Sequence, residues 1–292
     1  MSRATADRRL GARLIAPAFA IMGLVTAYPL ARAVWLSLFR DRLTDPAGRV
    51  FVGLGNYRTI LRDPLWWQDV AATAVIVVAS VTLELILGFV VAFALLRVVR
   101  GRAPLRTAVL IPYGVVTVVA AFAWRTAFAL DTGFVNAWLG LGERAWFGAR
   151  WSSFVVIVLA EVWKTTPFVA LLLLAGLAQI PADLDEAAAL DGAGAWQRFR
   201  RITLPNMRGA VLVAVLFRTL DAWRIFDTVF VMTAGAHGTE TLSFLAYRQT
   251  ITLLELGLGS AVSVLLFASV LLIAAAFLAG FRPDLAGAGE ER

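Results

Sequence analysis

The sequence predicts an all-α integral membrane protein in which six helices cross the bilayer. Of the 292 residues, 60% are hydrophobic and only 16% are charged, whereas soluble globular domains are about half apolar and a quarter charged. The mean hydropathy is +0.78. The apolar residues also gather in six separate runs, each long enough for the roughly 20 residues that a membrane-spanning helix needs.

The six runs follow one another along the chain, separated by shorter polar segments. They are Leu14–Phe39, Val70–Leu96, Ala103–Leu130, Ser152–Leu177, Ala210–Ala234 and Gly259–Phe281. The first run is longer than the apolar part of a secretory signal peptide, which has about 7 to 15 residues, so we expect an uncleaved anchor. No internal repeat or low-complexity linker divides the sequence, and we therefore expect one transmembrane domain over residues 1–292.

Arginine residues indicate which loops face the cytoplasm, because short cytoplasmic loops are rich in Lys and Arg. They gather before the first span, after the second span and after the fourth span. These groups are Arg3, Arg8, Arg9 and Arg13; Arg97, Arg100, Arg102 and Arg106; and Arg198, Arg200, Arg201 and Arg208. We predict a multi-pass protein of the cell membrane with both termini in the cytoplasm. The formal charge of +7 then reflects membrane topology and not nucleic-acid binding.

The composition excludes several kinds of chemistry. The chain has no Cys and a single His, His237, so disulfides, thiol catalysis, Cys/His zinc sites and His-based triads are excluded. Its only lysine is Lys164, and the residues before it do not form a GxxxxGK[ST] phosphate-binding loop. If nucleotide energy drives this protein, another chain must supply it.

The loop after the fourth span contains the polar sequence EAAALDGAGAWQRFRRITLP, from Glu186 to Pro205. Pro181 suits the first turn of a short helix, and Gly192 suits a left-handed C-cap. A second short helix is expected over Trp196–Ile202, ended by Pro205. An amphipathic loop resting on the lipid surface is the simple alternative for such a segment.

The residues of this loop resemble the EAA loop that permease subunits of ATP-binding-cassette importers carry after the fourth of six spans. The resemblance rests on EAAALDGA (Glu186–Ala193), Phe199 and ITLP (Ile202–Pro205). Three other motifs are similar to the sugar permeases related to the maltose and glycerol-phosphate importers: FVGLGNY (Phe51–Tyr57), FRTLDAWRIFD (Phe217–Asp227) and TETL (Thr239–Leu242). In general likeness the chain is most similar to the first permease subunit of actinobacterial trehalose importers.

The resemblance implies that residues 181–205 form a cytoplasmic coupling loop that docks on an ATPase subunit. By this likeness Glu186 pairs with a basic group of the ATPase, Ala187 and Ala188 allow close approach, and Gly192 turns the chain. The implied coupling residues are Glu186, Ala187, Ala188, Asp191, Gly192 and Phe199.

The fifth expected span carries four charged residues, Arg218, Asp221, Arg224 and Asp227. Charged residues inside a membrane are costly and therefore face a protein interior or a wet cavity. A spacing of three places each basic residue beside an acidic one, so one interpretation is a self-neutralising ladder. The other is a sugar site, because the resemblance implies sugar contacts at Arg218, Asp221, Ala222 and Ile225.

The fourth span offers a second polar cluster of Glu161, Lys164, Thr165, Thr166 and Pro167. The resemblance implies sugar contacts at Thr165 and Phe168, while a Glu161–Lys164 pair with a packing kink is an equal alternative. The complete expected pathway set is Lys164, Thr165, Phe168, Arg218, Asp221, Ala222, Arg224 and Ile225. Glu84 and Arg125 could be gate or packing residues, and packing is favoured.

The leading hypothesis is the membrane-spanning subunit of a binding-protein-dependent, ATP-driven sugar importer, without catalysis of its own. The resemblance implies a heterodimer with a second permease, two ATPase subunits that hold ATP and Mg²⁺, and an extracytoplasmic sugar-binding protein, all assembled in membrane lipid. The implied cargo is a disaccharide such as trehalose. A proton-coupled carrier using Glu161, Asp221 or Asp227 is the alternative. A membrane enzyme is the least favoured, because no paired carboxylates or metal-ligand set stands out on one loop.

Overall fold

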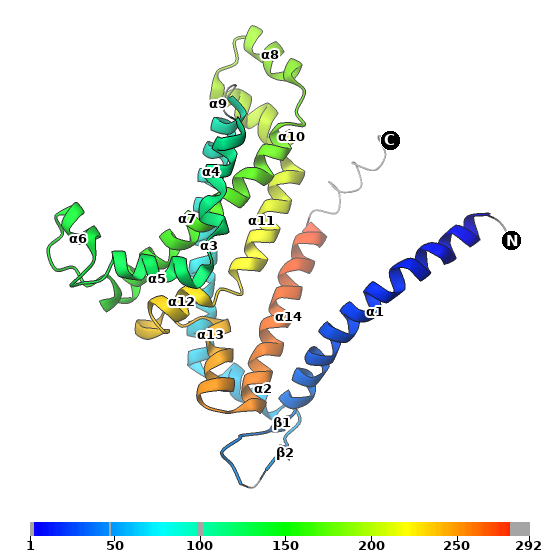
Figure 1. Cartoon of the computed structure of the whole chain (residues 1–292), viewed down its shortest axis with the longest axis vertical. Coiled ribbons are helices and arrows are strands. Elements are labelled where there is room, and N and C mark those ends of the chain that lie inside the picture. Colours follow the sequence, from blue (N-terminus) through cyan, green and yellow to red (C-terminus); the bar gives the residue numbers. More distant parts are fainter. Residues whose placement is uncertain (1–2, 47, 98–101, 281–292) are drawn as a thin grey trace. The chain divides into compact units, whose positions relative to one another are not determined.

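The computed structural model describes residues 3–46, 48–97 and 102–280, and most of these residues are helical. The two strands are β1 (Phe39–Arg40) and β2 (Val50–Phe51), which pair antiparallel with Phe39 opposite Phe51. The architecture confirms the all-α class (Figure 1). Arg100, in the second expected cytoplasmic loop, and Phe281, at the end of the sixth expected span, lie outside the described residues.

Contacts within the chain group it into two compact units. The first combines residues 1–66 with 245–267, and the second combines residues 67–244 with 268–292. The longer helices are α1 (Arg3–Ser37), α3 (Pro64–Arg97), α4 (Arg102–Gly114), α5 (Thr117–Ala127), α7 (Arg150–Leu177), α11 (Arg208–Ala222) and α14 (Leu256–Gly280). The shorter ones are α2 (Gly55–Arg62), α6 (Phe134–Leu139), α8 (Ala182–Leu190), α9 (Ala195–Arg198), α10 (Leu204–Asn206), α12 (Asp227–Met232) and α13 (Leu242–Tyr247). Single 3₁₀ turns lie at Trp146–Gly148 and Ala236–Gly238, and π-helical turns lie at Phe199–Thr203 and Arg248–Thr252.

In the first unit, one asparagine joins the end of α1 to α2. The Asn56 amide donates to the carbonyl oxygens of Ser37 and Phe39, each at 2.8 Å, and the hydroxyl groups of Ser37 and Tyr57 are 2.6 Å apart. Asn56 and Tyr57 belong to the FVGLGNY motif, and Asn56 is buried. The motif therefore holds the β1–β2 hairpin in place through backbone carbonyls, which a buried segment must pair.

In the second unit, α7 lies at the centre and contacts α4, α5, α11 and α12. One apolar cluster surrounds Ile157 and Val229, and another surrounds Leu173 and Met207. The crossing of α7 over α11 depends on Gly176, because a Cβ atom added there would lie only 2.5 Å from Cβ of Ala210. The small side chains allow the two backbones to approach closely, as is common between membrane helices.

Four helical segments among the described residues are long and apolar enough to cross a membrane, and they match the first, second, fourth and sixth expected spans. They are Ile15–Ser37, Pro64–Arg97, Arg150–Leu177 and Leu256–Gly280. A bent pair, Pro104–Gly114 with Thr117–Ala127, makes a fifth if it is taken as one span.

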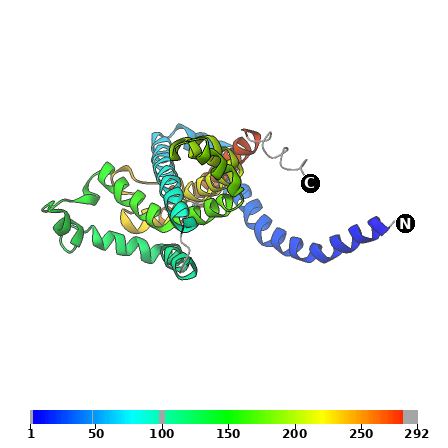
Figure 2. The same cartoon turned by 90° about the horizontal axis from the view of Figure 1, so that it is seen from above.

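The third and fifth expected spans are not continuous helices. In the third, α4 and α5 meet at an angle of 84°, just after Pro112 (Figure 1 and Figure 2). In the fifth, α11 has only 15 residues and ends at Ala222, and α12 begins at Asp227. Proline removes a backbone donor, and breaks at membrane depth persist where protein groups or a wet cavity satisfy the exposed carbonyls.

Candidate functional site

Both broken segments border the same cavity in the second unit, which has a volume of about 430 Å³. Its wall is formed by the α4–α5 bend, by the middle of α7 and by the end of α11 with the break that follows. The lining residues are Tyr113, Thr117, Glu161, Lys164, Thr165, Asp221, Ala222, Arg224, Ile225, Phe226, Asp227 and Thr228. The cavity therefore combines charged groups, hydroxyl groups and two aromatic rings.

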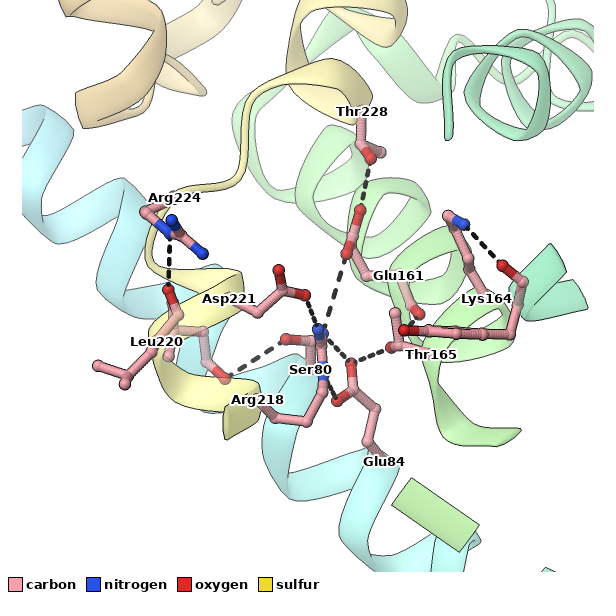
Figure 3. A network of polar contacts seen from close by, with 12 residues as sticks. Ser80, Glu84, Glu161, Lys164, Thr165, Arg218, Leu220, Asp221, Arg224 and Thr228 are labelled. Carbon is pink, nitrogen blue, oxygen red and sulfur yellow. Dashed lines mark hydrogen bonds and ion pairs between the residues drawn. The ribbon is translucent and has the colours of Figure 1, made fainter. Parts of the chain in front are cut away.

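A fully buried ion pair lies beside this cavity and joins α3 to α11. Arg218 donates from Nε to Oε2 of Glu84 at 2.6 Å and from Nη2 to Oε1 of Glu84 at 2.8 Å (Figure 3). The Thr165 hydroxyl on α7 lies 2.7 Å from Oε1 of the same carboxylate. The side chains of Glu84 and Arg218 are 0% and 2% exposed. A two-pronged contact of this kind satisfies the charges that burial removes from water.

The same guanidinium also faces two carboxylates that line the cavity. Its Nη1 forms an ion pair with Asp221, and its Nη2 lies 3.9 Å from Oε2 of Glu161. Glu161 also accepts a hydrogen bond from the Thr228 hydroxyl on α12. Asp221 is 66% exposed, so it presents a carboxylate to the cavity, whereas Glu84 is sealed off. Such an arrangement can accept hydrogen bonds from a polar, uncharged molecule.

Most of the expected pathway residues lie together, but two do not reach the cavity surface. Lys164, Thr165, Asp221, Ala222, Arg224 and Ile225 line it. Arg218 lies behind Asp221 in the buried network. The Phe168 ring stacks on the Tyr113 ring, with centroids 5.4 Å apart and planes at 14°, and Tyr113 is the ring that lines the cavity.

The geometry corrects two interpretations of the charges, the ladder along the fifth span and the Glu161–Lys164 pair in the fourth. Only the Arg218–Asp221 rung of the expected ladder forms among the described residues, because α11 ends at Ala222 and Asp227 belongs to the next helix. Arg224 instead donates to the Leu220 carbonyl at 3.3 Å. In the described part of the chain Lys164 does not pair with Glu161; its ammonium contacts the carbonyl oxygens of Tyr113 and Val115.

Sequence reasoning missed the role of Glu84, which it treated as a packing residue. The available signal was charge balance, since Glu84 is the only charged residue within the second expected span and needs a partner from another span in a membrane. Tyr113, Thr117 and Thr228 were also missed. They reach the cavity only because the chain breaks near them, and no local pattern of charge marks them.

The segment expected to couple to a partner begins with α8, an exposed helix. Glu186, Ala187 and Asp191 are exposed, Ala188 is half-buried, and the Leu190 side chain is 89% exposed. The helix ends as predicted, with Gly192 in the left-handed region at φ +79°. The Ala193 N–H donates to the Ala188 carbonyl and the Gly192 N–H to the Ala189 carbonyl, which closes the last turn.

Phe199 is directed toward α3 and not outward. Its ring packs edge-on against Phe89 and Phe93, at 5.5 and 6.0 Å between centroids, and stacks with Trp196 at 5.5 Å. The prediction that Pro205 stops the second short helix was wrong. The chain continues through a π-helical turn into α10, and Pro205 occupies the first turn of α10, where its missing N–H is not required.

Comparison with known proteins gives consistent matches over nearly the whole chain. Residues 84–285 match the family described as binding-protein-dependent transport system inner membrane component. The chain is 48% identical to a trehalose transport system permease protein of Mycobacterium tuberculosis, over 94% of this chain and 89% of the relative. It is 41% identical to a trehalose/maltose transport system permease protein of Thermococcus litoralis, over 91% of each chain. A crystal structure of a bacterial transporter that imports the acidic polysaccharide alginate contains a chain with the same fold, with a TM-score of 0.77, 20% identity and 96% coverage of each chain.

Proposed function

The chain belongs to the family of binding-protein-dependent transport system inner membrane components, and we propose that it forms half of the pathway of an ATP-driven importer for a neutral disaccharide such as trehalose. The observation that carries this proposal is the 48% identity to a trehalose permease over 94% of the chain. The cavity supports it on chemical grounds.

A neutral disaccharide presents many hydroxyl groups and no charge. Its site needs hydrogen-bonding groups of both kinds together with an apolar or aromatic surface. In this cavity Glu161, Asp221 and Asp227 accept hydrogen bonds, Arg224 and Thr117 donate them, and Tyr113 and Phe226 supply rings. A volume of about 430 Å³ lies within the range of about 300 to 1,000 Å³ that small-molecule sites occupy.

The remaining parts of the proposed assembly follow from the family. A second permease subunit completes the pathway as a heterodimer, and two ATPase subunits bind ATP and Mg²⁺. An extracytoplasmic sugar-binding protein delivers the cargo. The chain crosses the membrane six times with both termini in the cytoplasm. Residues 181–205 couple to the ATPase through the exposed α8 helix, whose Leu190 side chain is 89% exposed.

The decisive experiment compares two energy sources for uptake. The chain is reconstituted in liposomes, either alone or with its partner permease, the ATPases and the binding protein, and uptake of radiolabelled trehalose is measured. Uptake is expected only in the complete assembly, with ATP inside. Proton-gradient-driven uptake by this chain alone would establish the carrier alternative. Among the carboxylates, Glu84 and Glu161 already contact Arg218 and a threonine each, which disfavours their service as proton carriers.

A further inference from the structure

The bend between α4 and α5 leaves backbone carbonyl groups that the helices cannot pair. The last carbonyls of any helix lack an intrahelical donor, and α4 ends at Gly114 while α5 begins at Thr117. In a bilayer such carbonyls need a donor from elsewhere in the protein. The carbonyls of Tyr113 and Val115 lie directly at this bend.

Lys164, on the facing side of α7, supplies the donor for both of these carbonyls. Its Nζ atom lies 2.8 Å from the Val115 carbonyl oxygen and 3.3 Å from that of Tyr113. The ammonium also lies 5.7 Å from the centre of the Tyr113 ring. A cation at the carbonyl end of a helix is electrostatically favourable.

Phe168 strengthens the same attachment from one turn further along α7. Residues four apart lie on one face of a helix, so Lys164 and Phe168 both face the end of α4. The Phe168 ring stacks on the Tyr113 ring while Lys164 binds the Tyr113 backbone. The bend is therefore held by two charge-assisted hydrogen bonds from Lys164 and one ring contact from Phe168, all from α7.

The far end of α5 has an anchor of its own. Arg125 donates from Nη1 to the Val231 carbonyl on α12 at 2.9 Å. The outward face of α5 is exposed at Val119 (59%) and Phe122 (62%). The inner face of α5 packs against α12 and α7, with Ala120 and Ala121 buried, and Lys164 holds the end that adjoins the cavity.

We propose that Lys164 is a positioning residue that fixes the α4–α5 bend, so that Tyr113 and Thr117 form one wall of the cavity. The proposal rests on the proposed function, because it treats this cavity as the sugar pathway. It assigns Lys164 a role different from sugar contact, since two of its three N–H groups are directed to backbone carbonyls. The sugar then depends on Lys164 through the wall that Lys164 holds.

The first test measures the geometry of the bend. The chain contains no cysteine, so Val118→Cys on α5 and Val155→Cys on α7 give it a single pair of spin labels, and the complex is reconstituted with partner chains that lack reactive cysteines. One narrow distance distribution is expected for the wild type and for Lys164→Arg, which keeps charged donors. A broad or shifted distribution is expected for Lys164→Met. An unchanged distribution in Lys164→Met would overturn the proposal.

The matched control is Thr166→Val, two residues away on the same helix. The buried Thr166 hydroxyl has no hydrogen-bond partner among the described residues, and Thr166 is not among the residues that line the cavity. The control is expected to keep the wild-type distribution. If Lys164→Met does not assemble, Lys164→Gln replaces it, because the amide still offers two donors. A distance distribution of wild-type width in Lys164→Gln would then show that the bend does not need a charged side chain at this position.

The second test measures uptake. Displacing a wall of the site by about 1 Å can cost on the order of 100-fold in rate, so Lys164→Met should lower uptake per assembled complex by about 10- to 100-fold and raise the KM. Lys164→Arg should restore most of it. Direct sugar contact would instead give Lys164→Arg a transport defect with normal spin-label distances. The spin-label test requires no transport. Failure of the sugar assignment therefore remains distinguishable from failure of the positioning role of Lys164.

Discussion

Replacing Glu84 by alanine should destabilise the protein far more than replacing Asp221, although both carboxylates bind Arg218. Glu84 is fully buried and receives two guanidinium N–H groups. Its removal leaves the guanidinium buried with its main partner missing, at a cost of about 3–5 kcal/mol, or about 100- to 5,000-fold in the unfolding equilibrium. Asp221 is 66% exposed, and loss of such an ion pair costs about 1 kcal/mol or less.

The assay compares assembly and uptake in the same membranes. Glu84→Ala is expected to lower the amount of assembled complex and its unfolding temperature, with uptake falling in step. Asp221→Ala is expected to assemble normally, to leave the affinity of the binding protein for sugar unchanged and to reduce uptake strongly. Glu84→Gln, which retains an acceptor for Thr165, should fall between them. Equal assembly and equal unfolding temperatures for the two alanine variants would refute the distinction between a buried structural pair and an exposed cavity carboxylate.

Three further changes test other parts of the molecule. Gly192→Val should cost about 1–2 kcal/mol at the end of α8, because the backbone of residue 192 has a positive φ. Like charge reversal at Glu186, it should uncouple ATP hydrolysis from uptake. Wild-type coupling in both variants would exclude docking through α8. Phe199→Ala removes two edge-on ring contacts, each worth about 0.5–1.5 kcal/mol, and should increase proteolysis of residues 181–205 without loss of α3; an unchanged digestion pattern would contradict this anchor. Gly176→Ala should destabilise by about 1–3 kcal/mol through overpacking, and Ala210→Gly in the same chain should restore part of the unfolding temperature, as measured by thermal melts of the single and double variants.

The features that the sequence predicted are those determined by nearby residues. Long apolar runs defined the helices α3, α7 and α14, and Gly192 marked a turn whose geometry depends on its own backbone. The breaks after Pro112 and Ala222 escaped prediction because hydropathy averages over a window. Their stability also depends on distant donors, such as the Thr241 hydroxyl that bonds the Ile225 carbonyl at 3.1 Å.

The sequence predicted where the candidate site lies, but it did not predict which charged residues contact one another there. Charges within the fourth and fifth expected spans indicated a polar interior, and most of those residues line one cavity. The contact between Glu84 and Arg218 joins residues 134 positions apart, so no spacing rule reveals it. Lys164 was placed near the pathway by its neighbours, while its backbone partners became visible only once the α4–α5 bend was known.

The contrast between the buried pair and the exposed cavity side chains has an evolutionary consequence. Most substitutions that are lost in evolution are lost because they lower stability, and exposed positions tolerate change within about 0.5 kcal/mol. The exposed residues Asp221 and Arg224 can therefore vary with little effect on folding, while Glu84 and Arg218 must change together or remain. A transporter built in this way can acquire a new cargo through substitutions of exposed residues that line the cavity, while the buried ion pair between its helices is kept.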